Sequence, residues 1–311
     1  MKKNIDKSVL QNRFNSFLIS ALRYALLIAV GYIVLLPVFT MVTYAFKDVA
    51  DVFDQSVIWV PKHFTLDNIK RAYERLNYWS SFGNTIYIEI VSAFIQLCTA
   101  AITAYAFARF NFKFKKILYA FLMLTILIPT PMIIVSLYGN FSNFSFLGIN
   151  GLLEKVFNVD LTPNLLNTPL TFYLPALLSI GLKSGLSIFI FMQFFKGLPK
   201  ELEEAASIDG AGVFKTFATV ILPSSGTAVL TVTIFSVIWH WNDYYLITMY
   251  YSEGGTLARV LPGAFSYDYG SLTVALDQMA GCLLFILPLL IFYLILQRKF
   301  VQSIDSVGIV G

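Results

Sequence analysis

Six long apolar stretches constrain this chain more than any other feature of its sequence. The hydrocarbon core of a bilayer is about 30 Å thick and needs roughly 20 helical residues to cross it. Stretches of about this length cover residues 24–46, 82–107, 117–138, 170–195, 224–249 and 279–296. Hydrophobic residues make up 57% of the chain and charged residues only 13%, so too few polar side chains remain to cover a soluble core. We therefore predict an all-α membrane protein with six transmembrane helices.

The same composition excludes several other classes of protein. A disordered chain needs low hydrophobicity, a nucleic-acid-binding chain of the usual sort needs a strong basic excess, and a disulfide scaffold needs many cysteines. The net charge here is only +4, and the two cysteines lie inside apolar stretches. The basic residues before the first stretch invite a signal-peptide interpretation. That stretch is too long and lacks a small-residue cleavage site, so we expect it to stay in the protein.

The distribution of basic residues predicts the orientation in the membrane. Of the 22 Lys and Arg residues, 14 lie in the N-terminus, in the connections after the second and fourth stretches, and in the C-terminus. Cytoplasmic segments are enriched in Lys and Arg, so both termini are predicted to be cytoplasmic. This gives a cytoplasmic N-terminus (1–23), a six-span domain (24–296) and a cytoplasmic tail (297–311). Residues 66–76 have helical apolar spacing and are expected to form a short helix on the membrane surface.

The connection at residues 196–223 carries the strongest functional signal. Pro199 and the acidic residues after it are typical of a helix start, because acids in the first turn interact favourably with the helix dipole. The sequence Asp209-Gly210-Ala211-Gly212 predicts a turn, and a second short helix then continues until Pro223. One apolar side is expected on this second helix, formed by Val213, Phe214, Phe217, Val220 and Ile221. Two short helices around a glycine turn form a compact knob suited to the groove of another protein.

At these residues the chain resembles the permease subunits of ATP-binding-cassette importers. Their hallmark is Glu-Ala-Ala, three residues, Gly, then nine residues and an apolar close with a Leu-Pro pair. The matching residues are Glu204, Ala205, Ala206, Gly210, Leu222 and Pro223, and the match extends over residues 194–211. This form is similar to the carbohydrate-uptake branch, especially the smaller partner of the maltose-type permease pair. Further similar segments are Ile128-Pro129, Trp241-Asn242-Asp243-Tyr244 and residues 296–301.

The resemblance implies a type I importer fold and a division of labour between subunits. Residues 196–223 would be the coupling loop, seated in a cleft of a separate ATPase dimer that hydrolyses ATP with Mg²⁺. A second related permease, an extracytoplasmic sugar-binding protein and the lipid bilayer would be the other partners, with no nucleic acid. The chain contains no Gly-x-x-x-x-Gly-Lys-Ser/Thr phosphate loop, so we expect it to be no enzyme and to bind no cofactor or metal itself.

The same resemblance implies individual roles at the coupling loop. Glu204 would pair with a basic group of the ATPase, because a charge-assisted contact is directional. Ala205 and Ala206 would allow close approach, and Gly210 would permit a backbone conformation that side chains oppose. Asp209, Gly212 and Pro223 complete the predicted coupling site. Glu201 and Glu203 are interpreted as a solvated face.

Polar groups within the apolar stretches need water or a partner, since an ion at mid-membrane costs about 2.5–3.5 kcal/mol on insertion scales. Aromatic faces stack on sugar rings, and polar side chains form hydrogen bonds with sugar hydroxyls, so one segment rich in both is a candidate substrate path. The rival interpretation is that its aromatic residues anchor the chain at the membrane interface. Its residues are Trp239, Trp241, Asn242, Asp243 and Tyr244. Glu89 and Lys183 are interpreted as internal hydrogen-bond or ion-pair members, with a pair between them as one option. His240 is interpreted as an interfacial residue.

Two rival functions stay open at this point. The same machine could carry another polar solute, such as a glycerophosphate or a polyol. A proton- or sodium-coupled secondary transporter could use Glu89, Asp243 or His240 as relays. The segment from Glu204 to Pro223 favours the ATP-driven class, because a secondary transporter has no ATPase to dock. The sequence specifies neither the particular solute nor the role of the C-terminal tail.

Overall fold

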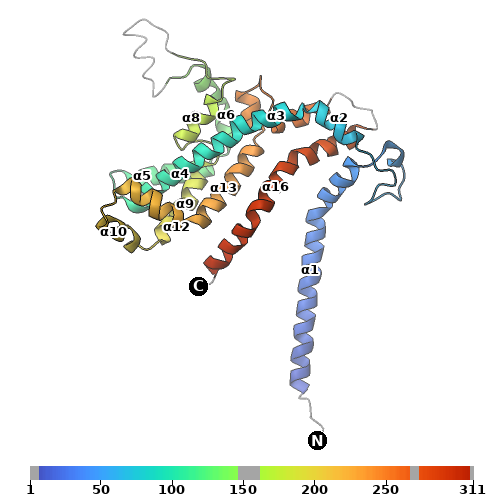
Figure 1. Cartoon of the computed structure of the whole chain (residues 1–311), viewed down its shortest axis with the longest axis horizontal. Coiled ribbons are helices and arrows are strands. Elements are labelled where there is room, and N and C mark those ends of the chain that lie inside the picture. The colour runs from blue at the N-terminus through green and yellow to red at the C-terminus, as the bar shows by residue number, and fades with distance from the viewer. Residues whose placement is uncertain (1–6, 146–161, 267–272, 309–311) are drawn as a thin grey trace. The chain divides into compact units, whose positions relative to one another are not determined.

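The computed structural model describes residues 7–145, 162–266 and 273–308, and these residues are mostly helical (Figure 1). Within these ranges there is no strand, and an isolated bridge pairs Lys47 with Phe64. The prediction of an all-α chain is confirmed. In chain order the elements are α1 (Lys7–Ala45), η1 (Val49–Asp51), α2 (Asp67–Arg75), α3 (Tyr78–Thr85), η2 (Ile86–Ile90), α4 (Val91–Arg109), α5 (Lys115–Leu127), α6 (Thr130–Ser142), α8 (Leu170–Leu177), α9 (Ser184–Gly197), α10 (Glu201–Ile208), α11 (Val213–Thr216), η4 (Phe217–Ile221), α12 (Leu222–Ser224), α13 (Gly226–Trp241), α14 (Tyr245–Tyr250), α15 (Leu257–Ala264) and α16 (Val274–Gly308).

The chain divides into two compact units. The first comprises Met1–Glu74 and Tyr267–Leu284, and the second comprises Arg75–Ser266 and Phe285–Gly311. In the first unit, the side-chain amide of Asn68 is buried and donates to the carbonyl oxygens of Tyr44, Ala45 and Lys47 at 3.3, 3.2 and 2.8 Å. The last carbonyl groups of a helix have no partner within it, so Asn68 satisfies the end of α1. The helix expected over residues 66–76 is confirmed as α2, which supplies Asn68.

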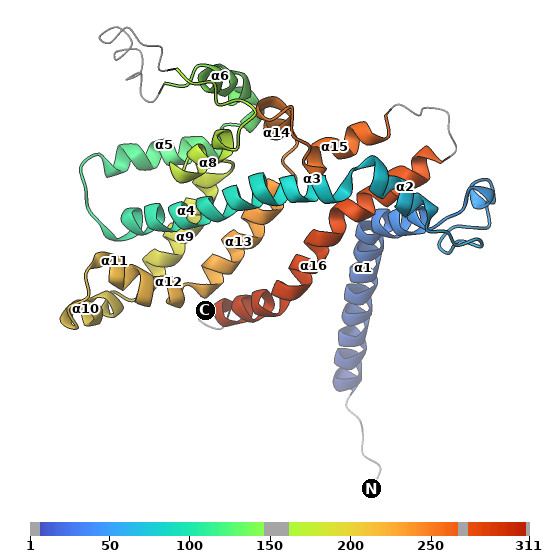
Figure 2. The same ribbon diagram turned by 45° about the horizontal axis from the view of Figure 1, so that its top comes forward.

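The core of the second unit lies where α4 packs against α9 and α13 (Figure 2). The contacting face of α4 is made of small residues, which allow helix backbones to approach closely. These buried residues are Ala93, Ala100, Ala101 and Ala104. Larger side chains of α9 recur at helical spacing and fill the same core, namely Ile188, Phe191, Met192 and Phe195.

Three helical segments are individually long and apolar enough to cross a bilayer. They are Asn15–Ala45, Tyr78–Arg109 and Val274–Lys299. Two further pairs pass the same test together but bend sharply, which gives five segments if each pair counts as one. In Asn15–Ala45, 6% of the most apolar window is buried.

Two predicted spans are broken rather than continuous. The stretch 117–138 contains most of α5 and most of α6, which meet at 107°. Ile128 between them is extended (φ −76°, ψ 119°), since the residue before a proline is disfavoured in the helical region and Pro129 is the next residue. The stretch 170–195 contains α8 and α9, separated by residues 178–183.

Side chains of α4 satisfy the backbone at the second of these breaks. The Thr99 hydroxyl donates to the carbonyl oxygen of Ala176 at 2.7 Å, and the hydroxyls of Thr103 and Ser179 lie 3.1 Å apart. Ser179 has a positive φ of 60°, so the helix cannot continue through it. Thr99 of α4 thus adds a hydrogen bond to the backbone at the end of α8, and Thr103 contacts the side chain of Ser179 within the break.

The predicted span 224–249 also ends early as a helix. Its main helix, α13, ends at Trp241, and α14 begins at Tyr245. At its other end, α13 meets the helical segment Val213–Ser224 at 82°. By contrast, α16 continues through residues 297–308 of the predicted tail; residues 309–311 lie outside the described residues.

Candidate functional site

The loop at residues 196–223 folds as two short helices around a glycine turn, as predicted. Helix α10 ends in a Schellman motif, in which Gly210 N–H donates to Ser207 O at 3.0 Å and Ala211 N–H donates to Ala206 O at 2.9 Å. Gly210 has a φ of +76°, a left-handed conformation that a side chain would strain. Gly212 has an ordinary φ of −72° and open space around it, so nothing in the fold requires glycine there.

Most of the predicted coupling residues are exposed. Glu204, Ala205, Asp209, Gly210, Gly212 and Pro223 all lie at the surface, whereas Ala206 is buried against the rest of the unit. Helix α10 therefore turns Glu204 outward and Ala206 inward. The part of the knob that is free to meet another protein includes the acid and the turn.

The interpretation of Glu203 as part of a solvated face is wrong. Its carboxylate Oε1 lies 3.2 Å from Arg109 Nε at the end of α4, and only 21% of the Glu203 side chain is exposed. Glu201, on the same helix, is exposed as expected. The two acids differ because Arg109 belongs to a helix much earlier in the chain, which helical spacing within the loop does not reveal.

The apolar side of the second short helix is only partly buried. Phe217 and Ile221 are buried in the core, but Val213 and Phe214 are 51% and 79% exposed. Val213, Phe214 and Phe217 nevertheless line one depression, so these three residues share a side of the helix.

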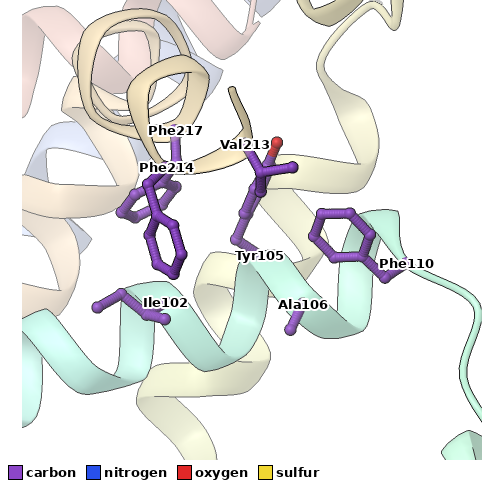
Figure 3. A pocket seen from close by; sticks show the side chains of 7 residues that line it. All are labelled: Ile102, Tyr105, Ala106, Phe110, Val213, Phe214 and Phe217. Carbon is purple, nitrogen blue, oxygen red and sulfur yellow. The ribbon is translucent and has the colours of Figure 1, made fainter. Parts of the chain in front are cut away.

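A shallow apolar depression of about 130 Å³ lies between this helix and α4 (Figure 3). Figure 3 shows Val213, Phe214 and Phe217 on one side of it. The other side is formed by Ile102, Tyr105, Ala106 and Phe110. The knob thus leans on α4 through apolar contacts as well as through Arg109.

The five candidate substrate-path residues do not share one surface. Trp241 is only 3% exposed, and its indole N–H donates to Phe285 O at 3.2 Å. Asp243 is buried; its Oδ1 accepts from Leu246 N–H at 3.1 Å, and its Oδ2 has no hydrogen-bond partner. Trp239 is half-buried and its ring stacks on another ring of α13. Asn242 and Tyr244 are exposed.

A buried polar cluster lies next to this segment and joins several helices. His240 Nδ1 lies 3.0 Å from Glu89 Oε2, and His240 Nε2 lies 2.9 Å from Gln96 Oε1. Gln96 Nε2 donates in turn to the Ser187 hydroxyl at 3.3 Å. All four side chains are buried. The cluster connects the last turn of α13 to η2, α4 and α9.

This cluster confirms the interpretation of Glu89 as an internal residue and corrects those of His240 and Lys183. His240 is interior rather than interfacial, and Glu89 is an internal hydrogen-bond member whose partner is His240 rather than Lys183. Lys183 is exposed at the left-handed residue (φ 56°) that precedes α9. Sequence reasoning missed Gln96 and Ser187, since a lone amide or hydroxyl in an apolar helix gives no signal of its partner.

The described residues contain no group of three or more His, Cys, Asp or Glu side chains arranged to hold a metal ion. Two carboxylate oxygens in the cluster region, Glu89 Oε1 and Asp243 Oδ2, are buried without a hydrogen-bond partner. Burying a carboxylate oxygen without a hydrogen bond destabilises a fold, so the packing of the helices does not explain why two such oxygens are present here.

Comparisons with known proteins connect this arrangement to transport. The chain is 30% identical over 269 residues to the "Probable starch degradation products transport system permease protein AmyC" of Thermoanaerobacterium thermosulfurigenes, covering 86% of this chain and 89% of the relative. It is 28% identical to the "Melibiose/raffinose/stachyose import permease protein MelC" of Bacillus subtilis, covering 83% and 86%.

A solved structure shares the fold. It is a chain of a bacterial ABC transporter involved in the import of the acidic polysaccharide alginate, with a TM-score of 0.69 and 17% identity, covering 92% of this chain and 98% of that one. Residues 96–306, about two thirds of this chain, match a family described as "Binding-protein-dependent transport system inner membrane component". The chain therefore belongs to the family of inner-membrane components of binding-protein-dependent transport systems.

Proposed function

We propose that this chain is the permease subunit of an ATP-driven importer of a carbohydrate, in particular an oligosaccharide. The observation that carries the proposal is the exposed acid Glu204 beside the left-handed Gly210 turn, presented on a knob that packs on α4. The relatives support a sugar substrate, because those named above are described as permeases for starch degradation products and for melibiose, raffinose and stachyose.

The coupling loop would dock in a separate ATPase dimer, which binds ATP and Mg²⁺. The absence of a phosphate loop from the sequence supports this assignment. A second, related permease would complete the translocation path, and an extracytoplasmic binding protein would deliver the sugar. In this arrangement Glu204 contacts a basic group on the ATPase, and Ala205, Asp209, Gly210, Gly212 and Pro223 shape the docking surface, with the buried Ala206 packed beneath it.

The proposal includes six spans in the bacterial cytoplasmic membrane, with both termini inside. Five segments are long and apolar enough when each bent pair counts as one span: α1, α3 to α4, α5 to α6, residues 213–241, and α16. The broken pair α8 and α9 would be the sixth. The excess of Lys and Arg in the connection after α4 supports a cytoplasmic position for that connection and for the knob.

The candidate substrate path lies at the break between α13 and α14. Asn242 and Tyr244 are exposed and can meet a sugar through an amide and an aromatic ring. Trp239, Trp241 and Asp243 then act as the wall behind them, since Trp241 and Asp243 are buried and Trp239 is half-buried.

The test is reconstitution of the complete complex in vesicles with radiolabelled maltodextrins and raffinose-type oligosaccharides. We expect Glu204→Ala to lose uptake and Glu201→Ala, on the same exposed helix, to retain it. Full uptake by Glu204→Ala would contradict the coupling role. ATPase that copurifies with the wild-type chain, and is stimulated by one of these sugars, would establish the class of substrate.

The buried acid and histidine side chains favour one second candidate, an ion-coupled transporter that uses Glu89, His240 or Asp243 as relays. The two functions respond oppositely to one treatment. Uptake that stops without ATP and continues after collapse of the proton and sodium gradients fits the importer. The reverse result would replace it with the second candidate.

A further inference from the structure

Arg109 joins the predicted coupling helix to the end of α4. Its guanidinium Nε lies 3.2 Å from Glu203 Oε1 on α10, and its Nη2 donates to the carbonyl oxygen of Leu198 at 2.8 Å, just before α10. Only 7% of the Arg109 side chain and 21% of the Glu203 side chain are exposed. The guanidinium is therefore hydrogen-bonded to the segment leading into α10 and ion-paired with the helix itself, without a hydrogen bond between Nε and Oε1.

The surroundings of this pair make it more than a surface ion pair. Tyr105, one turn before Arg109 on α4, is buried. Tyr105 also contacts Phe195 and Phe217 of the core. An ion pair that is largely removed from water is screened little by salt, and loss of one partner leaves the other charge without compensation.

The knob is also connected to the membrane helices through the chain from α12 to α13, but this connection is poorly suited to transmit movement. The chain leads directly from α12 to α13, but the helix direction changes there by 82°. In contrast, Tyr78–Arg109 is helical along 32 residues, about 48 Å at 1.5 Å per residue. Arg109 lies at one end of this segment and Glu89, with its bond to His240, lies toward the other.

We propose that Arg109 and Glu203 are positioning residues that fasten the coupling helix α10 to α4, so that α4 transmits movement of the knob to the Glu89–His240 cluster. This rests on the proposed function, since a partner must move the knob. Arg109 and Glu203 touch neither nucleotide nor sugar in this scheme. Their role is to make α10 and α4 move as one body.

The test measures movement at the far end of α4 in the complete complex. In a Cys98→Ser/Cys282→Ser background, Tyr87→Cys places a reporter thiol at an exposed position two residues before Glu89. Its labelling rate by a soluble maleimide is measured without nucleotide and after trapping with Mg-ATP and vanadate. We expect the nucleotide to change this rate with wild-type Arg109 and Glu203, and Glu203→Gln to abolish most of that change.

The matched control is Glu201→Gln, which removes a charge of the same kind from the exposed face of α10. It should respond to nucleotide as the parent does. Arg109→Gln should lose the response like Glu203→Gln, and the double variant should lose no more than either single one, because both remove the same interaction. ATPase copurification and the melting temperature of each variant show whether the complex is intact.

Each outcome separates this inference from the proposed function. If the ATPase does not copurify with the parent chain, the proposed function fails. If it copurifies but Glu203→Gln responds as Glu201→Gln does, or if the parent shows no nucleotide response, the role of α4 is wrong. If Glu203→Gln loses ATPase binding altogether while Glu203→Asp keeps both binding and the response, the carboxylate is needed for the proposed link.

Discussion

His240 Nδ1 and Glu89 Oε2 lie 3.0 Å apart, which ties the last turn of α13 to the π-helical turn before α4. His240 Nε2 faces a second acceptor, Gln96 Oε1, at 2.9 Å. The imidazole Nε2–H therefore donates a hydrogen bond to Gln96 Oε1. Its other nitrogen, Nδ1, forms a second hydrogen bond with Glu89 Oε2. An apolar side chain of similar size cannot satisfy both neighbours.

Replacement of this histidine should destabilise the fold. We expect His240→Ala to lower stability by about 1–3 kcal/mol, because hydrogen bonds between membrane helices contribute about 1 kcal/mol and an acid left without a partner adds to the loss. Glu89→Gln keeps a side chain that can bond the imidazole and should cost less. Thermal unfolding in detergent measures both, and equal melting temperatures for His240→Ala and the parent would contradict the bridging role.

The two glycines of the knob provide a second prediction. Gly210→Ala should destabilise the turn by about 1–2 kcal/mol, the cost of a left-handed conformation for an L-residue. Gly212→Ala should have little effect on folding, because its φ is ordinary and its surroundings are open. The measurement is the binding of the partner ATPase to each of the two glycine variants. A loss of binding with Gly212→Ala alone would mean that the partner approaches this backbone closely.

The helical class, the short helix α2 and the two short helices around the Gly210 turn were predictable because each depends on local sequence. Apolar length predicts helices, acids after Pro199 predict a helix start, and Gly210 predicts a turn. The interior pairings were not predictable in this way. Glu203 has a local environment much like that of Glu201, and only the distant Arg109 distinguishes the two.

The two π-helical turns, η2 and η4, were not predicted from the sequence. Each holds one extra residue in a helical turn, and apolar spacing alone does not reveal it. Pro129 was visible in the sequence as a site of bending, but the size of the bend between α5 and α6, 107°, was not.

The loop after α1 should respond to pH through His63 and Asp51. Their side chains lie 2.6 Å apart, and the hydrogen bond to Asp51 raises the pKa of His63. The hydrogen bond from the His63 backbone N–H lowers the pKa of Asp51. The histidine contribution to the folded loop is complete below its ordinary pKa of about 6.5 and is lost as pH rises through its raised folded pKa.

The aspartate acts in the opposite sense. Its contribution is present above its ordinary pKa of about 3.9 and is lost as pH falls through its lowered folded pKa. The loop should thus be most protected between about pH 4 and pH 6.5. The measurement is the pH dependence of amide hydrogen exchange in residues 48–66, corrected for intrinsic exchange rates, in the parent chain and in His63→Gln. The same pH dependence in both proteins would assign it to other groups.

The ion pair between Arg71 on α2 and Asp277 at the start of α16 gives the last prediction. The Arg71 Nη2 atom lies 2.8 Å from Asp277 Oδ1, and Asp277 is fully buried. Removal of one partner from a buried pair typically costs about 3–5 kcal/mol, whereas replacement of both by apolar residues is often neutral. Arg71 is 35% exposed, so the cost of Arg71→Met should lie at or below the lower end of that range. The double variant Arg71→Met/Asp277→Leu should recover most of the loss in thermal unfolding. If the double variant is less stable than Arg71→Met, Asp277 has a further role that the leucine cannot replace.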